Sequence, residues 1–317
     1  RASWGQTGNS QIPNYGSIAL LDDANAILGG GVNNGLTPNT SPNPNLSWET
    51  TSTTDIGLEA SFFNNKLSIV ADYYVADTED MLLNVPVPAQ SGFTTSLQNI
   101  GKIRNKGFEF AINANNISLG EVSWSSSFNI STNDNEVLAL GEGQERIVSN
   151  GSRNVTEVGG TLGAHYGYII TGVFGSQAEI DAVPHLSSAK VGSYIYKDVN
   201  ADGNISSADR DILGDFHPDY TFGLSNTFKY KGFDLNVLLS GVQGVVIHDR
   251  LVSTTLYNQE GWANASLDLY LNHFNVNTNP NGIYAAATPR PTDNNHRASN
   301  LFVDDGSYVR IRNITLG

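Results

Sequence analysis

The sequence predicts an all-β protein in which antiparallel strands form one extended sheet, and three observations lead to this fold class. Apolar and polar residues alternate with a period of two over many segments, the pattern of strands with one apolar face. Several segments keep this alternation for about nine residues or more, longer than the ~5–6 residues usual in a globular sheet. Convincing amphipathic helices are missing apart from a possible turn at Ser176–Ala182.

Three hairpins carry the clearest alternation. Each joins two segments whose apolar residues fall on one side: Asp55–Phe63 with Leu67–Val75, Phe108–Asn115 with Val122–Ile130, and Phe222–Tyr230 with Phe233–Ser240. The alternation is weakest at Tyr308–Leu316, where Val309 and Ile311 oppose Arg310 and Arg312. We expect roughly ten or eleven strands, joined alternately by tight turns and long connections. The long connections are Gly8–Asn45, Asp80–Leu97, Glu136–Gly160 and Leu251–Asn300.

Two architectures explain this alternation. In a soluble sandwich the apolar residues point into a shared core, whereas in a transmembrane β-barrel they face lipid and the polar residues line the lumen. The strand lengths and the alternation of short turns with long loops favour the barrel. Aromatic residues near strand ends also favour it, as an interfacial girdle; they are Trp48, Tyr73, Tyr74, Tyr166, Tyr168, Tyr194, Tyr196, Tyr220 and Tyr230. The candidate lumen residues are Glu59, Asp72, Asn113, Asn129 and Asn236.

Composition narrows the function classes. The 317 residues include 31 Asp and Glu against 17 Lys and Arg, a net charge of −14, and such a chain repels the phosphates of nucleic acid. Cysteine is absent, so disulfides and thiolate metal sites are impossible. No apolar run is long enough for a transmembrane helix. The first residues, RASWGQTGNSQ, lack the zones of a signal peptide, and both ends read as the middle of a strand, so we expect a piece of a longer chain.

The segment DVNADGNISSAD at Asp198–Asp209 has the oxygen-ligand spacing of a calcium loop. Gly203 falls at position 6, where the backbone must turn sharply, and Ile205 at position 8 is expected to anchor the loop to packed structure. The candidate metal ligands are Asp198, Asn200, Asp202, the Asn204 carbonyl, Ser206 and Asp209. Asp209 replaces the usual Glu and has a shorter side chain, so we expect a weaker or structural Ca²⁺ site. The alternative is a polar turn that is merely rich in Asp and Asn.

No catalytic residues are expected. Glycosidases need two carboxylates facing one cleft, and nothing in the sequence pairs two acids beyond the calcium-type loop. No HExxH or GxSxG motif occurs, and the histidines are scattered. They are His165, His185, His217, His248, His273 and His296. Aromatic residues of the long loops are candidates for stacking on sugar rings, namely Trp4, Tyr15, Tyr257 and Trp262.

Seven segments, spread nearly end to end, carry a family resemblance. They are GQTGN (Gly5–Asn9), NPNLSWE (Asn43–Glu49), NIGKIRNKGFEF (Asn99–Phe110), VGGTLGAHYGYIITGVF (Val158–Phe174), YKDVNADGNISSADRDILGDFHPDYTFG (Tyr196–Gly223), FKYKGFDLNVLLSGVQG (Phe228–Gly244) and DDGSYVRIRNITLG (Asp304–Gly317). Together and in this order, they resemble the SusC/RagA family of TonB-linked outer-membrane transporters. One small departure is Ser193, where the family often has Asp.

The resemblance implies that residues 1–317 are a fragment of the C-terminal region of a transmembrane barrel of roughly 22 strands with long extracellular loops. The plug, the signal peptide and the last strands of such a transporter would lie outside this segment. The resemblance also implies a location in the bacterial outer membrane, a SusD-type surface lipoprotein as lid, coupling to TonB through the plug, an oligosaccharide or peptide cargo, and a homodimer of barrels. The Asp/Asn-rich motif that family members commonly carry in this part of the barrel matches Asp198–Asp209. The alternative function is a soluble, calcium-stabilised β-rich module with a glycan-binding or adhesive face.

Overall fold

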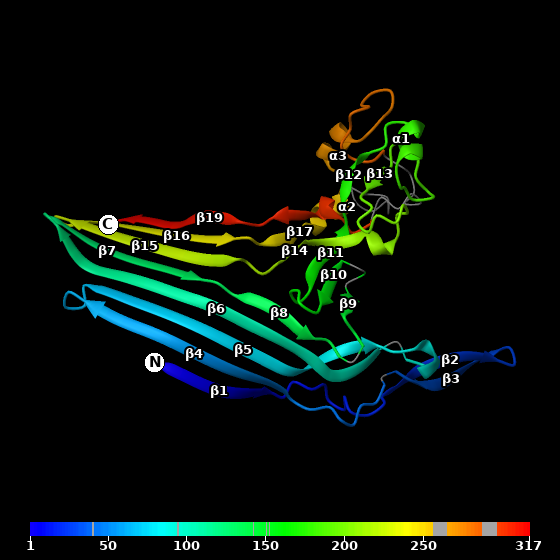
Figure 1. The fold of residues 1–317 in the computed structure, drawn as a ribbon, viewed down its shortest axis with the longest axis horizontal. Coiled ribbons are helices and arrows are strands. Elements are labelled where there is room, and N and C mark those ends of the chain that lie inside the picture. Colours follow the sequence, from blue (N-terminus) through cyan, green and yellow to red (C-terminus); the bar gives the residue numbers. More distant parts are fainter. Residues whose placement is uncertain are drawn as a thin grey trace.

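The strands pair into one large curved sheet, and a smaller unit lies beyond one end of it (Figure 1). The structure is a computed structural model that describes residues 1–39, 41–93, 95–141, 143–149, 151, 153–255, 265–286 and 297–317. The large sheet has nine strands in the order β1-β4-β5-β6-β7-β15-β16-β19, with β8 paired to β6. Their bounds are β1 (Ala2–Asn9), β4 (Glu49–Phe62), β5 (Leu67–Pro86), β6 (Thr95–Leu119), β7 (Val122–Ser131), β8 (Asp134–Ala139), β15 (Tyr220–Tyr230), β16 (Phe233–Gln243) and β19 (Tyr308–Leu316).

All pairs in the large sheet are antiparallel, and the three predicted hairpins are confirmed as β4–β5, β6–β7 and β15–β16. Their tight turns gather at one end of the sheet, while the long connections lie at the other (Figure 1). Asn64 and Asn65 have φ angles of 56° and 64°, and Lys231 has a φ of 50°. Left-handed angles of this kind match the twist of the flanking strands. The sheet therefore has one end of short turns and one end of long excursions, as predicted.

Several strands were missed or are longer than expected. The structure has 19 strands among its described residues, against the ten or eleven predicted. β5 and β6 run for 20 and 25 residues and take up most of the segment Asp80–Leu97, which was expected to be a connection. The connection Gly8–Asn45 contains a separate hairpin, β2 (Leu21–Leu28) with β3 (Gly31–Pro38). β2, β3 and the far parts of β5 and β6 thus extend beyond the part of the large sheet that carries the alternating apolar face.

A bulge explains the weak alternation in the last strand. The pairing of β16 with β19 shifts register between Leu238 and Leu239. Val309 and Ile311 lie on the apolar face before the shift, and Ile314 and Leu316 return to that face after it. The extra residue in β19 reverses which side of the sheet the following residues face. The apolar residues of β19 therefore stay on the apolar face along the whole strand.

The smaller unit, here called the cap, consists of the described residues within 146–214 and 246–305. Its strands are β9 (Arg146–Ser149), β10 (Asn154–Glu157), β11 (Ala164–Tyr168) and β14 (Arg210–Gly214) in one sheet, and the pairs β12 (Ile170–Val173) with β13 (Tyr194–Tyr196) and β17 (Val246–His248) with β18 (Val303–Asp305). Its helices are α1 (Gln177–Ala182), α2 (Arg250–Thr255) and α3 (Leu267–Asn272), with 3-10 turns η3 (Ser207–Asp209) and η4 (Asn300–Phe302); η1 (Ala89–Ser91) lies outside the cap. The turn predicted at Ser176–Ala182 is confirmed as α1, capped by the Ser176 side chain. No helix among the described residues is long and apolar enough to span a membrane.

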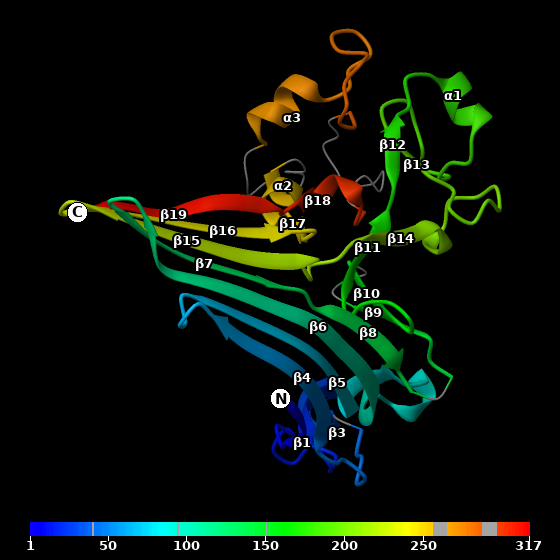
Figure 2. The same ribbon diagram turned by 60° about the vertical axis from the view of Figure 1, so that its left-hand side comes forward.

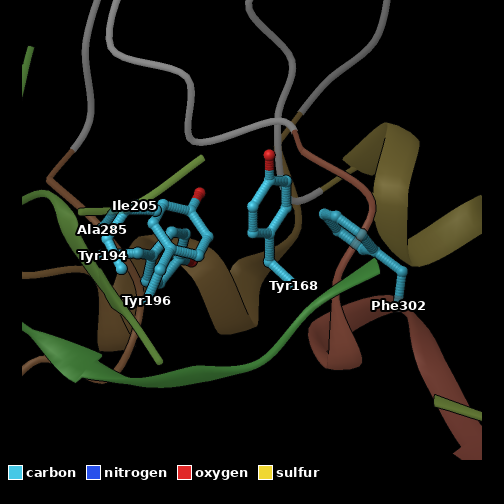
Figure 3. Packing of buried hydrophobic residues seen from close by; sticks show 6 residues of the cluster. All are labelled: Tyr168, Tyr194, Tyr196, Ile205, Ala285 and Phe302. Atoms are coloured by element: carbon cyan, nitrogen blue, oxygen red, sulfur yellow. The ribbon is translucent and has the colours of Figure 1, made fainter. Parts of the chain in front are cut away.

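The cap has its own hydrophobic core (Figure 3). Its buried members are Tyr168, Tyr194, Tyr196, Ile205, Ala285 and Phe302. Tyr166 is buried in a second, smaller cluster with Val155 and Ala164. The prediction that Tyr166, Tyr168, Tyr194 and Tyr196 belong to an interfacial girdle was therefore wrong, because these rings pack inside the cap. Tyr73 and Tyr230 remain exposed on the large sheet.

Candidate functional site

The outer face of the large sheet is apolar and uncovered. Ile56 pairs with Tyr73 and Tyr73 with Phe108, so the apolar residues of successive strands line up on one face. Among the described residues no second layer packs on this face, and Leu58 and Leu316 are 64% and 73% exposed. The other large exposed members are Trp4, Ile56, Phe62, Tyr73, Phe108, Phe228, Tyr230, Phe233, Val309, Ile311 and Ile314. An apolar surface of this extent is unstable in water and marks an interface with lipid or protein.

This apolar face has a defined height. On β5, Leu67–Val75 rises about 27 Å along the strand at ~3.4 Å per residue. With a tilt of about 40°, the height is about 21 Å, close to the ~25 Å apolar band of outer-membrane barrels. Beyond Val75 the same face becomes charged: Arg104 donates to Asp77 at 2.7 and 2.8 Å, Lys106 pairs with Asp134 at 2.9 Å, and Lys102 pairs with Glu79. These ion pairs mark the level on the strands beyond which the outer face is no longer apolar.

The inner face carries the residues predicted to line the lumen. Strand register places Glu59, Asp72, Asn113, Asn129 and Asn236 all opposite to the apolar face. Most of them bind to neighbours: Ser127 donates to Asn113 at 2.6 Å, and Asn236 donates to Thr227 at 2.9 Å. A shallow cavity of about 300 Å³ on this face includes Asp72, Glu109 and Asn129 in its lining. The inner face is therefore polar and water-accessible.

An ion pair crosses a glycine on this inner face. Arg1 donates to Asp72 at 2.7 Å and lies 3.4 Å from Glu59. The pair passes over Gly57, where an added Cβ would come within 2.1 Å of Asp72 Oδ1 and 2.6 Å of Arg1 Nε. Gly57 therefore leaves the space in which Arg1, the residue before β1, reaches across β4 to Asp72 of β5.

The calcium-type loop connects β13 to β14 and is anchored in the cap as predicted. Ile205 is buried in the cap core beside Tyr196 (Figure 3). Ser206 caps η3: its side chain accepts from Ala208 N, and its own backbone N donates to Asp209 Oδ2 at 2.7 Å. Gly203 has a φ of 83°, which meets the expectation of a sharp turn at this position.

Two carboxylates of the loop are turned inward. Asp209 is fully buried, and its oxygens accept from Val199 N at 3.0 Å and Ser206 N at 2.7 Å. Burial raises the pKa of Asp209, but hydrogen bonds from backbone N–H groups outweigh it, so the pKa lies below its usual value. Asp198 Oδ2 accepts from Gly203 N at 2.9 Å, while Asp198 Oδ1 is buried with no hydrogen-bond partner. An orphaned carboxylate oxygen beside a second buried carboxylate fits a bound hard cation.

The remaining candidate ligands are arranged differently. Asp202 accepts from Asn204 N at 2.8 Å and from Asn200 Nδ2 at 3.0 Å, in hydrogen bonds local to the loop. In the described part of the chain, no group of three or more His, Asp or Glu side chains is gathered as a metal centre. The loop therefore brings Asp198 and Asp209 together and leaves Asn200 and Asp202 engaged with each other.

Three histidines that are scattered in the sequence lie near one another in the structure. The ring centroids of His165 and His248 lie 6.4 Å apart, and the Phe216 ring centroid lies 6.4 Å from that of His165 and 4.1 Å from that of His217. His165 Nε2 is 3.0 Å from Val246 O, and His217 Nε2 is buried with no hydrogen-bond partner. Burial, with Arg153 and His165 nearby, holds the pKa of His248 below its usual value. No sequence spacing indicates this cluster, because its members come from β11, the β14–β15 link and β17.

The candidate sugar-stacking residues do not share a site. Trp4 lies in β1 opposite Thr54 on the outer face rather than in a loop, so that expectation was wrong. Tyr15 is exposed in the connection after β1. Tyr257, Trp262 and His296 lie outside the described residues.

Comparison with known proteins identifies the family. The model of the TonB dependent receptor-like β-barrel family matches residues 1–237. TonB-dependent receptor P3 of Formosa agariphila is 35% identical over the whole chain, which covers 32% of that protein, and TonB-dependent receptor SusC of Bacteroides thetaiotaomicron is 29% identical over 87% of the chain and covers 26% of SusC. The solved RagAB peptide transporter superposes on the whole chain, and on 34% of its own, with a TM-score of 0.76 and 25% identity.

The chain belongs to the TonB-dependent receptor-like β-barrel family. The predicted SusC/RagA relationship, the antiparallel barrel fold, the outer-membrane location and the expectation of no enzymatic activity are confirmed by this membership and these relatives. The chain spans about a third of the length of the curated relatives that it matches most fully.

Proposed function

We propose that this chain is the wall of a TonB-dependent transporter that imports oligosaccharides or peptides across the outer membrane. The two-faced sheet carries the proposal: an uncovered apolar band faces outward and a polar, water-accessible face lies opposite it. The apolar face holds the wall in lipid, and the polar face lines a hydrated path. The soluble-module alternative would leave Leu58, Ile311 and their neighbours in water, so we disfavour it.

In this proposal the edges β1 and β19 pair with further strands of the same barrel, because unpaired backbone groups in hydrocarbon cost several kcal/mol each. A plug within the closed barrel contacts TonB, and a SusD-type lipoprotein covers the mouth at the cap. The relatives support these partners: one is named SusC, and a structural neighbour is described as the RagAB peptide transporter. Pairing of two barrels stays a prediction of the resemblance.

The test is uptake by cells that express the full-length receptor with its neighbouring lipoprotein gene. Labelled oligosaccharides and peptides are supplied with and without an uncoupler that collapses the proton gradient. We expect uptake of one cargo class that requires the receptor and stops with the uncoupler. Uptake that is equal in cells lacking the receptor, or a full-length protein soluble without detergent, would contradict the proposal.

We further propose a structural Ca²⁺ in the Asp198–Asp209 loop, held by Asp198, Asn200, Asp202, the Asn204 carbonyl and Asp209, with Ser206 acting through water. The orphaned Asp198 Oδ1 supports it. When bound, Ca²⁺ offsets the repulsion between the Asp198 and Asp209 carboxylates. Ile205, next to the ligands, would then be fixed in the cap core.

The calcium proposal is tested by limited proteolysis of the full-length receptor in Ca²⁺ or in chelator. Chelator should expose the cap to cleavage in the wild type, and Asp198→Ala should be cleaved under both conditions. Asn204→Ala is the matched control, because it keeps the backbone carbonyl that serves as ligand. A cap equally resistant in chelator and in Ca²⁺ would count against the site.

A further inference from the structure

Two arginines converge on one buried tyrosine of the cap. The guanidinium carbon of Arg210 lies 5.3 Å from the centroid of the Tyr168 ring, and that of Arg297 lies 4.9 Å from it. Arg297 Nη1 also donates to Tyr168 Oη at 2.7 Å. Figure 3 shows the Tyr168 ring standing between those of Tyr196 and Phe302, so its position is fixed by the core. The two guanidinium groups are thus held no more than about 10 Å apart by a shared rigid ring.

The backbone explains why both arginines lie against Tyr168. Tyr168 and Arg210 are direct partners across the β11–β14 ladder, so their side chains leave the same face of that sheet. The segment of Arg297 runs alongside β11, with Tyr168 N donating to Ala298 O at 2.8 Å and Tyr168 bridging to Ser299. Figure 2 shows β11 and β14 at the end of the large sheet that carries the long connections. The pair therefore lies at the mouth of the proposed barrel.

Neither arginine forms an ion pair with a carboxylate in the described part of the chain. The acids next to Arg210 are engaged elsewhere: Asp209 accepts backbone bonds inside the calcium-type loop, and Asp211 accepts from Ile212 N at 2.8 Å. Six other cations among the described residues do have carboxylate partners. They are Arg1, Lys102, Arg104, Lys106, Arg146 and Lys231.

Arg146 is the informative comparison. Its guanidinium carbon lies 5.6 Å from the centroid of the Tyr166 ring, in the same kind of stack, but it also pairs with Glu157 at 2.7 Å. Both arrangements stabilise the cap through cation–π contact, yet only Arg146 has an internal anion. Arg210 and Arg297 are both partly exposed, so an anion arriving from solvent can reach them.

We propose that Arg210 and Arg297, oriented by Tyr168, bind a carboxylate group of the imported cargo at the barrel mouth. The inference rests on the proposed transport function and narrows the cargo to molecules bearing a carboxylate. Guanidinium groups present paired N–H donors that match the two oxygens of a carboxylate, and they keep their charge at every physiological pH. Stacking on the ring restricts their rotamers in advance, so less side-chain entropy is lost when the ligand binds.

The test measures binding to the purified full-length receptor in detergent by calorimetry. Two matched ligand pairs distinguish the source of the carboxylate: a peptide with free carboxyl groups against its amidated form, and an oligouronate against a neutral oligosaccharide of equal length. We expect the wild type to prefer the carboxylate member of one pair. Arg210→Gln and Arg297→Gln should each weaken that member by about 10- to 100-fold, the loss of one charge-assisted interaction, and leave the neutral member unchanged.

Three further variants separate binding from structure. Arg146→Gln, the control, should leave all affinities unchanged. Arg210→Lys should recover only part of the affinity, because the charge remains without the paired donors. Tyr168→Phe should weaken binding less than either arginine change, since it removes only the hydroxyl contact to Arg297.

Two results would overturn the inference: a wild type that binds no carboxylate ligand, or arginine variants that bind both members of each pair as the wild type does. The arginines would then serve only the stability of the cap. Failure of the transport function itself has a different signature, namely no receptor-dependent uptake of any probe by cells.

Discussion

Replacing Leu58 by arginine places a cation in the middle of the apolar band of β4. Leu58 is 64% exposed on the outer face, so in water the substitution would change stability by no more than about 0.5 kcal/mol. In a bilayer, arginine near the midplane of a barrel costs about 2–4 kcal/mol. That corresponds to a fall of roughly 30- to 900-fold in the ratio of folded to unfolded receptor. The two media thus give clearly different expectations for one exposed residue.

Ser61→Arg is the matched control, because Ser61 lies on the same strand but on the inner face, opposite Ser68. There the new side chain reaches water, and we expect a change within about 0.5 kcal/mol. Both variants are made in the full-length receptor, folded into phospholipid vesicles, and titrated with denaturant while folding is followed by heat-dependent mobility in SDS gels. Equal stability of the two variants would refute the assignment of this face to lipid.

Three further outcomes are expected. Ile205→Ala removes a buried side chain from the cap core and should destabilise the cap by about 2–4 kcal/mol, seen as faster cleavage of the cap while the SDS resistance of the barrel is unchanged; an unaltered cleavage rate would contradict the packing in Figure 3. Gly57→Ala should break the contact between Arg1 and Asp72, because the new Cβ overlaps Asp72 Oδ1; denaturant titration should show the same loss with Asp72→Asn, and no added loss when both are combined. His248 has a pKa below its unfolded value, so its unfolded form binds more protons and the cap should lose stability as pH falls through about 6.5. Cleavage at pH 5 should therefore exceed that at pH 8, and His248→Gln should reduce the difference.

The faces of the large sheet could be predicted because alternation depends only on the pleat of each strand. Leu58 and Glu59 point to opposite sides in any antiparallel sheet, whatever surrounds it. The same reasoning failed for Tyr168 and Tyr196, which follow an alternating pattern but are covered by segments far away in the chain, such as Ser299 and Phe302. Their burial is a property of tertiary contacts, which the local pattern does not contain.

The candidate sites divide in the same way. The spacing from Asp198 to Asp209 is local, so the turn at Gly203 and the anchoring role of Ile205 were predictable. The shared contact of Arg210 and Arg297 with Tyr168 was not predictable, because 86 intervening residues separate the two arginines along the chain. The sequence offers only a partial indication of this site. Arg210 directly follows the calcium-type motif and begins β14, a strand that must pair with another strand.

The hairpin turns at residues 63–66 and 231–232 have four and two residues, whereas the long connections leave the sheet at its opposite end (Figure 1). The apolar face and the cap therefore come from separate stretches of the sequence: the cap lies within 146–214 and 246–305, on either side of β15 and β16. Both cap stretches can therefore be replaced in evolution without changing a residue of the apolar face. Conversely, inserting a tag or an epitope at the outer rim should leave biogenesis intact, while the same insertion at the hairpin turns would disturb the closing of adjacent strands.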